Sequence, residues 1–406
     1  MHILFVVPYT PNLIRVRPYN LIRSLAADGN KISVLTIYSE ESERADLEEL
    51  KNYCHQVEGF FLPRWKSYWN CLKALPSSKP LQSKYCWHPE LASRIKELLS
   101  SASAEDPIDI VHIEHLRGAQ YGLYIKNIDN HTPVVWDSVD SISLLFEQAS
   151  ESSTEQINKF ITQFDLVRTR NFEGQMVGRF ERLLVTSNAD KEAYISYSDN
   201  HHADENINIL LNGVDLEYFT QNQSIKREQN TIVISGKMSY HANVAMVTHF
   251  IEEIYPKIKT SCPEVKLWIV GKDPPGKIIS MGQDPSIEVT GMVPDIRPYL
   301  LRATVAVAPL TYGAGIQNKV LEAMACATPV VSTAQAVAAL EVAPNRDIFI
   351  ADNPSDFANK VITLFSNQTL RQEVGLAGRR YVEKNHHWGS IATRLEGIYN
   401  EIIYPG

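Results

Sequence analysis

The chain has 406 residues, of which 44% are hydrophobic and 21% charged, and its formal net charge is −8. This composition is typical of a soluble globular protein of two or three domains. The net negative charge argues against a general nucleic-acid binder, which carries a dominant basic face. No apolar run approaches the ~18 residues of a membrane-spanning helix. The five cysteines lack C-x-x-C spacing, so we expect buried free thiols and no zinc site.

In the first half of the chain, apolar strands alternate with amphipathic helices. Residues 3–7 are continuously apolar, as in a strand buried on both faces of a parallel sheet. Pro18 begins a helix that ends near Gly29, and residues 32–35 begin the next strand. Further strands are predicted at residues 109–113, 133–136, 182–187 and 208–211. The first apolar stretch is too short for a signal peptide, so we expect a cytoplasmic protein.

A second series of the same kind follows a polar stretch, residues 220–230, which we interpret as the domain connection. Its predicted strands are residues 231–235, 265–270, 287–290, 304–309, 329–332 and 347–351. Two successive series predict an α/β protein with two doubly wound, Rossmann-like domains. Ligands of such sheets bind at the carboxyl ends of the strands, so we expect a site in the cleft between the domains.

The most informative segment is a Gly-rich turn that joins a predicted strand to a helix within residues 309–325. The backbone N–H groups of such a turn and the following helix N-terminus favour an anionic ligand. Lys319 adds a cation there. Glu322 lies three residues further along the same helical face, where it can accept two hydroxyls of a ribose. A Lys–Glu surface pair at an ordinary helix start would give the same sequence.

Two other loops at strand ends have a similar character. Gly236 permits close approach of a ligand, and Lys237 can meet a phosphate, although a solvated loop lysine fits equally. Residues 290–297 form the next loop, in which Val293 is suited to reading a base edge. An ordinary turn is the alternative for this loop.

Together these segments resemble the C-terminal domain of family-4 glycosyltransferases, which have the GT-B fold. The resemblance extends to residues 212–215 and to the C-terminal helix, residues 388–399, which crosses back to the N-terminal domain in that family. We accordingly expect domains at residues 1–218 and 219–384, followed by a crossing helix at residues 385–406. The nearest similarity is to sugar transferases of bacterial exopolysaccharide and exosortase-associated systems, which implies a role in polysaccharide biosynthesis.

The resemblance implies a hexosyltransferase that uses a nucleoside-diphosphate sugar as donor and a glycan or lipid-linked molecule as acceptor. It implies retention of the anomeric configuration without a metal or other cofactor. Glu322 matches the ribose-binding glutamate, Lys237 the diphosphate-binding position and Val293 the base-contacting loop. Charge gathers on the leaving diphosphate, where Lys237, Lys319 and nearby amides would stabilise it. The remaining predicted donor contacts are Gly236, Ile316, Gln317 and Asn318.

Three features depart from the family pattern. Ala314 replaces the first of two glutamates, which normally holds the donor sugar. Ala242 replaces a second basic residue, and Lys319 lies near enough to the same diphosphate to supply that charge. Arg15 and Arg17 stand in a loop where paired glycines are usual. They can make bidentate phosphate contacts or be ordinary surface arginines.

The N-terminal domain carries the acceptor in this interpretation. Glu114 and His115 follow a predicted strand, and either can orient an acceptor hydroxyl or take its proton. Solvated side chains at a capped strand end are the alternative. Asp137 and Asp140 follow the next strand and are candidates for binding sugar hydroxyls. Asp140 and Ser141 equally suit a helix cap.

The stretch Gly59–Pro89 contains no acidic residue. Its basic residues are Arg64, Lys66, Lys73, Lys79 and Lys84. Its aromatic residues are Phe60, Phe61, Trp65, Tyr68, Trp69, Tyr85 and Trp87. This combination suits an anionic membrane or a lipid-phosphate acceptor, and hence peripheral contact with the inner face of the membrane. The helical spacing of Trp65, Trp69 and Leu72 is also explained by packing on the domain.

Two other functions share some of these features. Ala314 and Ala242 motivate a non-catalytic sugar-nucleotide binder, and a nucleotide-sugar epimerase has the same two-domain fold. A nicotinamide dehydrogenase is disfavoured because no G-x-G-x-x-G follows the first strand.

Overall fold

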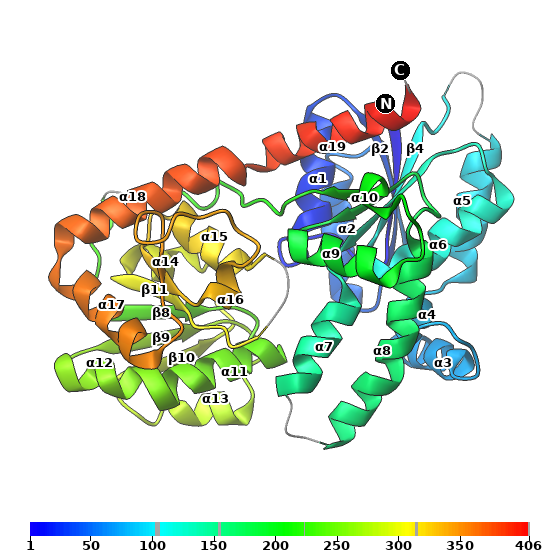
Figure 1. The fold of residues 1–406 in the computed structure, drawn as a ribbon. Helices are drawn as coiled ribbons and strands as arrows, with labels where there is room; N and C mark the ends of the chain where they lie inside the picture. The colour runs from blue at the N-terminus through cyan, green and yellow to red at the C-terminus, as the bar shows by residue number, and fades with distance from the viewer. Residues whose placement is uncertain (102–105, 153–155, 223, 313–315, 405–406) are drawn as a thin grey trace. The chain divides into compact units, whose positions relative to one another are not determined.

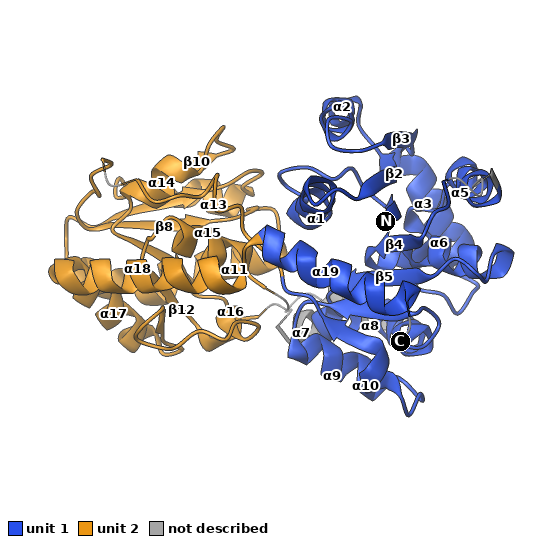
Figure 2. Ribbon diagram, turned by 90° about the horizontal axis from the view of Figure 1, so that it is seen from above, with its two compact units in different colours: residues 1–211, 388–406 blue, residues 212–387 orange. Residues whose placement is uncertain are grey.

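The structure is a computed structural model that describes residues 1–101, 106–152, 156–222, 224–312 and 316–404. The chain divides into one unit of residues 1–211 with 388–406 and a second of residues 212–387 (Figure 2). We call them unit 1 and unit 2. In each, helices cover a sheet of parallel strands (Figure 1). The divisions lie seven residues before and three after the expected boundaries at 218 and 384.

The sheet of unit 1 has seven strands in the order β3-β2-β1-β4-β5-β6-β7. They are β1 (His2–Val7), β2 (Lys31–Tyr38), β3 (Gln56–Phe61), β4 (Ile110–Glu114), β5 (Val134–Val139), β6 (Arg182–Val185) and β7 (Ile207–Ile209). All pair in parallel. The edge strand β3 is not among the predicted strands, because its residues are only partly buried and form no apolar run.

The helices of unit 1 come from both ends of the chain. They are α1 (Val16–Ala27), the short η1 (Glu41–Glu43), α2 (Arg44–Leu50), α3 (Arg64–Ala74), α4 (Leu81–Tyr85), α5 (Pro89–Ser101), α6 (His115–Ile128), α7 (Ile142–Ser152), α8 (Gln156–Met176), α9 (Asn188–Tyr197), α10 (Ala203–Asn206) and α19 (Trp388–Ile403). Helix α19 packs beside α1 and buries Trp388, Leu395 and Tyr399 in the same core cluster as β1. The C-terminal helix therefore completes the core of unit 1.

The sheet of unit 2 has six strands in the order β10-β9-β8-β11-β12-β13. They are β8 (Thr231–Ser235), β9 (Lys266–Val270), β10 (Ile287–Gly291), β11 (Val305–Ala308), β12 (Val330–Ser332) and β13 (Phe349–Ile350). The helices are α11 (His241–His249), the π-helical η2 (Phe250–Ile254), α12 (Tyr255–Ser261), α13 (Gly276–Met281), α14 (Arg297–Arg302), α15 (Asn318–Ala325), α16 (Ala334–Val337), α17 (Pro354–Ser366) and α18 (Gln368–Asn385).

Both sheets reverse their direction of winding in the middle. In unit 1, β1 pairs with both β2 and β4, and in unit 2, β8 pairs with both β9 and β11. The loops that leave the two central strands diverge at such a switch point and leave room for a ligand. The predicted α/β fold of two doubly wound sheets is confirmed.

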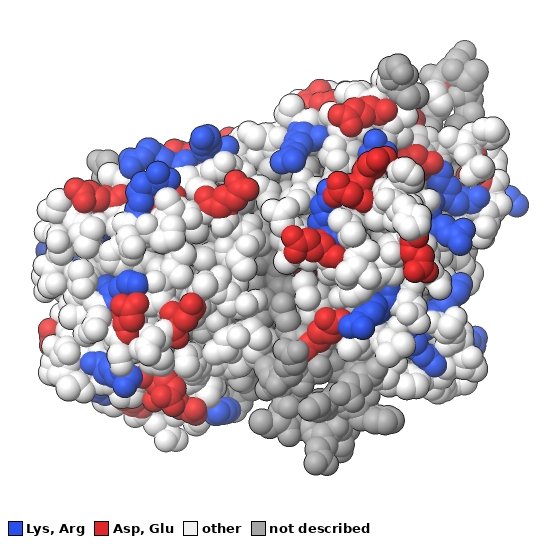
Figure 3. Space-filling model, in the orientation of Figure 1, with Lys and Arg blue, Asp and Glu red and all other residues white. Residues whose placement is uncertain are grey.

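On the face drawn in Figure 3, Lys and Arg side chains are interspersed with Asp and Glu. Among the helices in the described ranges, none has the length and apolar character of a membrane span. All five cysteines are free thiols, as predicted. Cys86, Cys262 and Cys326 are buried as expected, whereas Cys54 and Cys71 are only partly buried.

Candidate functional site

The loops after β8 and β11 meet at the switch point of unit 2. Gly236 follows β8 with φ of +147°, a value that few residues other than glycine adopt. A Cβ at this position would lie 3.4 Å from Cε of Lys319 and 2.9 Å from Nδ2 of Asn243. The side chain of Lys319 therefore runs directly over Gly236. Two residues that the sequence analysis selected from separate loops are brought together here.

A second glycine explains how closely these loops approach. Gly271 follows β9, and a Cβ there would lie 1.7 Å from the carbonyl oxygen of Gly236. Its N–H donates to the carbonyl oxygen of Gly291, at the end of β10, over 3.2 Å. The backbones of Gly236, Gly271 and Gly291 thus pack directly against one another close to Lys319. Sequence analysis did not select Gly271. Its position directly after an apolar strand is the signal that could have identified it.

Lys319 and Glu322 lie in the first turns of α15 and are both half-buried. Burial lowers the pKa of Lys319 to about 8, an effect that the charge of Glu322 opposes. Burial likewise raises the pKa of Glu322 to about 7 against the charge of Lys319. The ammonium group donates to Oε1 of Gln317 over 2.9 Å. Both shifts are caused by desolvation, which an ordinary surface pair does not undergo.

Two asparagines add polar groups beside the two lysines. Asn243, on α11, donates from Nδ2 to the carbonyl oxygen of Lys237 over 2.9 Å and so fixes that loop. Its Oδ1 and that of Asn318 are buried and have no hydrogen-bond partner among the described residues. Lys237 itself is exposed. Asn243 was missed because its partner lies in a different element and only the folded loop reveals it.

His241 and Tyr312 form a further contact between the start of α11 and the loop after β11. Nδ1 of His241 lies 2.9 Å from the hydroxyl of Tyr312, and the two rings are 12° from parallel. Burial lowers the pKa of His241. The neighbouring Ala242 is buried in the core, so that position provides no cation at the surface. Ala314 lies outside the described residues.

The loop that contains Val293 is held by an internal ion pair. Nε and Nη2 of Arg297 donate to the carboxylate of Asp295 over 2.7 to 3.0 Å, and this lowers the pKa of Asp295. The guanidinium carbon of Arg297 lies 3.9 Å from the ring centroid of Tyr218. Val293 is half-buried. The ion pair and the contact with Tyr218 restrain the end of this loop.

In unit 1, three predicted residues lie in a buried ion network. Nε of Arg17 donates to Oδ2 of Asp137 over 2.8 Å, and Nε2 of His112 lies 3.5 Å from Oε2 of Glu114. The hydroxyl of Tyr9 donates to Oε1 of Glu114 over 3.2 Å. The side chains of Glu114 and Asp137 are 0% exposed. The interpretations of Glu114 as solvated and of Arg17 as a surface residue are therefore wrong.

Arg15 does not share this network. Its side chain is about one third exposed and pairs with Glu43 at 3.0 Å, and its guanidinium lies over the ring of Tyr9. Arg15 and Arg17 thus each form an ion pair with a carboxylate side chain of this protein. Sequence proximity suggested a shared phosphate contact, whereas the fold gives the two side chains separate partners.

Glu114 and His115 differ in the protonation that their surroundings favour. Burial and the charge of Asp137 raise the pKa of Glu114, while His112 and Arg17 act in the opposite direction. Burial, together with Arg117, lowers the pKa of His115 to about 3. Nδ1 of His115 accepts the N–H of Arg117 over 3.3 Å. With Nδ1 accepting this N–H, the neutral ring carries its proton on Nε2, where it can donate to an oxygen.

The backbone is strained at the ends of β4 and β5. His115 has φ of +62° and Val139 has φ of +70°, which is uncommon for any residue with a Cβ and rare for a β-branched one. Val139 follows a bulge in β5, and its N–H donates to Oδ1 of Asp137 over 3.1 Å. Strain of this kind concentrates at functional sites, and here it lies on adjacent strands.

Asp140 and Ser141 have separate roles. Asp140 accepts from the hydroxyl of Thr186 over 2.9 Å, and burial raises its pKa. The hydroxyl of Ser141 accepts from the N–H of Leu144 and so caps α7. The helix-cap interpretation therefore holds for Ser141.

Sequence analysis missed two buried acidic residues that contact the N-terminus of α7, namely Glu173 of α8 and Asp190 of α9. Glu173 accepts from the N–H of Ile142 over 2.8 Å, and Asp190 accepts from the N–H of Ser141 over 2.9 Å. Burial raises the pKa of each to about 7. Both lie far along the chain from α7, so no local pattern marks them.

Comparison with protein-family models matches residues 229–367 to the family described as glycosyl transferases group 1. This segment contains Gly236, Lys319 and Glu322. Comparison with curated protein sequences finds no match.

Solved structures match almost the whole chain. Sucrose-phosphate synthase from Thermosynechococcus elongatus has a TM-score of 0.70 at 15% identity, with 100% of each chain covered. HepE of Anabaena, solved in complex with UDP, has a TM-score of 0.68 at 15% identity, with 98% of this chain and 99% of that one covered. WaaG, a glycosyltransferase involved in lipopolysaccharide biosynthesis, has a TM-score of 0.62 at 15% identity, with 100% of each chain covered. The chain thus has the GT-B fold, and its second unit contains a segment that matches the glycosyl transferases group 1 model.

Proposed function

We propose that the protein is a retaining hexosyltransferase of family 4, which transfers a sugar from a nucleoside-diphosphate sugar to a glycan or lipid-linked acceptor. The observation that carries the proposal is the placement of Lys319 over Gly236 at the switch point of unit 2. This placement lies within the segment that matches the family model. A half-buried cation beside a helix N-terminus and closely packed glycine loops is suited to a diphosphate.

In the proposed reaction, the bond from the anomeric carbon to the diphosphate oxygen breaks and a bond to the acceptor oxygen forms. Lys237, Lys319 and the amides of residues 316–318 stabilise the negative charge that gathers on the leaving diphosphate. Glu322 accepts the ribose hydroxyls. In unit 1, Nε2–H of His115 orients the acceptor. The acceptor proton passes to the oxygen of the leaving diphosphate as the new bond forms.

We propose that no metal is required. One group of side chains in unit 1 has the spacing of metal ligands, because the donor atoms of His112, Glu114 and Asp137 lie within 4.8 Å of one another. The guanidinium of Arg17 already supplies a positive charge to Asp137 there, so the group is explained as an ion network.

We also propose a cytoplasmic protein of polysaccharide biosynthesis that contacts the membrane peripherally.

The test begins with nucleotides, because HepE of Anabaena was solved with UDP and with UDP-glucose. Calorimetry should show binding of at least one of UDP, GDP and ADP, measured with EDTA present. Turnover of the matching sugar nucleotide should require an added glycan or lipid extract. Interconversion of donor sugars without an acceptor would instead indicate an epimerase, and binding without turnover would indicate a non-catalytic binder.

A further inference from the structure

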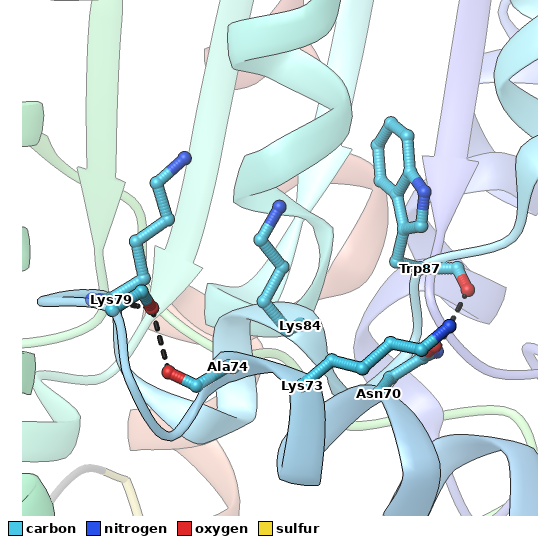
Figure 4. Close-up of a pocket in the computed structure, with 7 residues that line it drawn as sticks. Asn70, Lys73, Ala74, Lys79, Lys84 and Trp87 are labelled. Carbon is cyan, nitrogen blue, oxygen red and sulfur yellow. Dashed lines mark hydrogen bonds between the residues drawn. The ribbon is translucent and has the colours of Figure 1, made fainter.

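Unit 1 contains a pocket of about 390 Å³ between α3, α4 and the loops beside them. Its lining includes Lys73, Lys79 and Lys84 together with Asn70, Ser77 and Trp87. In Figure 4, Lys79, Lys84 and Trp87 extend in the same direction from α4 and its flanking loops. The lining contains no acidic residue. Three cations in a pocket of this size are suited to an anionic group as large as a phosphate or a diphosphate.

The three lysines lack a counter-charge in the part of the chain that the structure describes. Lys79 donates only to the amide oxygen of Gln120, over 3.4 Å, and none of the three is within 4.0 Å of a described carboxylate oxygen. Lys84 lies 5.3 Å from the ring centroid of Trp87. Burial and the charge of Lys79 lower the pKa of Lys84. An anion in the pocket would relieve this mutual repulsion.

The walls of the pocket are fixed in advance. Nδ2 of Asn70 donates to the carbonyl oxygen of Trp87 over 3.0 Å and ties α3 to the end of α4. The indole of Trp87 stacks on Tyr121, with ring centroids 5.1 Å apart. Asn70 and Trp87 would therefore lose little conformational entropy on binding, because these two side chains are already held.

The adjoining face of α3 is apolar and exposed to solvent. Trp65 is 65%, Trp69 53% and Leu72 52% exposed, so the interpretation that these residues pack on the domain is wrong. The ammonium groups of Lys66 and Lys73 each lie 5.7 Å from the ring centroid of a neighbouring tryptophan. Lys73 also lines the pocket, so the face and the pocket are continuous.

We propose that this pocket binds the phosphate of an anionic lipid while the exposed face of α3 enters the interfacial layer of the membrane. A soluble phosphate would use the three lysines but leave the two exposed indoles and Leu72 without a partner. A lipid uses both features, because indoles and lysines together suit the boundary between headgroups and acyl chains. The site lies in unit 1; it deepens the peripheral membrane contact of the proposed function and rests on that part of it, whereas the donor site in unit 2 is tested separately.

The test is co-sedimentation of the full chain with two kinds of vesicle. One kind is phosphatidylcholine alone, and the other contains one third phosphatidylglycerol. We expect binding only to the second kind, with weaker binding at high salt. Replacing Lys73, Lys79 and Lys84 together by Gln should lower the partition coefficient on the order of a hundredfold. The matched control replaces Lys96, Arg179 and Arg394 by Gln, which are exposed residues elsewhere in unit 1.

A second pair of measurements separates the lipid from a soluble phosphate. Replacing Trp65 and Trp69 by Ala should reduce vesicle binding and abolish the blue shift of tryptophan fluorescence on binding, while calorimetric binding of pyrophosphate is kept. The proposal is overturned if the wild type stays in the supernatant with anionic vesicles, or if pyrophosphate binds but vesicles do not. It is also overturned if the control triple variant loses as much binding as the pocket variant. UDP binding to the same variants reports on the proposed function separately.

Discussion

Lys319 and Glu322 are two ionisable residues whose burial moves their pKa values toward neutrality, to about 8 and about 7. A bound diphosphate needs the cation, and ribose hydroxyls need the carboxylate. Lys319 is a cation only below its pKa, and Glu322 is a carboxylate only above its pKa. The affinity for a nucleotide should therefore depend on pH.

The affinity for UDP should therefore be greatest between pH 7 and 8. Above pH 8 the free protein must take up a proton at Lys319 to bind the anion, and below pH 7 it must lose one from Glu322. Calorimetry from pH 6 to 9 measures both limbs. Lys319→Met should remove the alkaline limb and Glu322→Gln the acid limb, whereas the exposed Lys384→Met should keep both. A flat profile for the wild type would contradict this assignment.

Gly236→Ala tests the close contact with Lys319. The new Cβ would lie 2.9 Å from Asn243 at a φ that alanine rarely adopts. Strain of this kind costs about 1–3 kcal/mol, and the displaced Lys319 should weaken UDP binding. Gly276→Ala is the control, because nothing lies within 4 Å of its new Cβ. Equal UDP affinity in both variants would show that Lys319 is not positioned by Gly236.

At the scale of elements, α19 joins a buried polar network as well as an apolar core. The hydroxyl of Tyr399 lies 2.7 Å from Nδ1 of His112 and bonds to it, deep in unit 1. His112 in turn faces Glu114 and Asp137. The C-terminal helix thereby supports the side chains at the end of β4.

Tyr399→Phe should lower the free energy of unfolding by about 1–3 kcal/mol, because it leaves a buried ring nitrogen without its partner. Denaturant unfolding measures this loss. Tyr404→Phe is the matched control, since Tyr404 is exposed. Unchanged stability in Tyr399→Phe would show that His112 finds another partner.

At the scale of the whole molecule, the two units differ in chain continuity. Unit 2 is a single segment, residues 212–387, whereas unit 1 needs residues 1–211 and 388–406. Without α19, apolar side chains of α1 and β1 lose part of their cover.

We expect residues 212–387 to fold alone and to bind UDP, because Gly236, Lys237, Lys319 and Glu322 all lie within them. Residues 1–211 alone should aggregate. Expression of both fragments, followed by circular dichroism and calorimetry, measures this difference. A folded unit 2 that does not bind UDP would show that unit 1 supplies a necessary contact.

The sequence by itself determined the fold class and the elements that carry the site. Continuous apolar runs marked strands such as β1 and β8, because a strand buried on both faces has no polar side. The Gly-rich turn before α15 was visible because its glycines, cation and carboxylate are close in sequence.

Only the tertiary structure decided which side chains are buried and with whom they pair. Arg17 and Asp137 are 120 residues apart, and Asn243 meets Lys237 only once the loop has folded. The helical spacing of the two tryptophans of α3 is compatible with packing and with exposure, and the fold shows that both are exposed. Burial and pairing depend on residues that are distant in sequence and that the order of the parallel strands brings together. A local sequence pattern does not specify those residues.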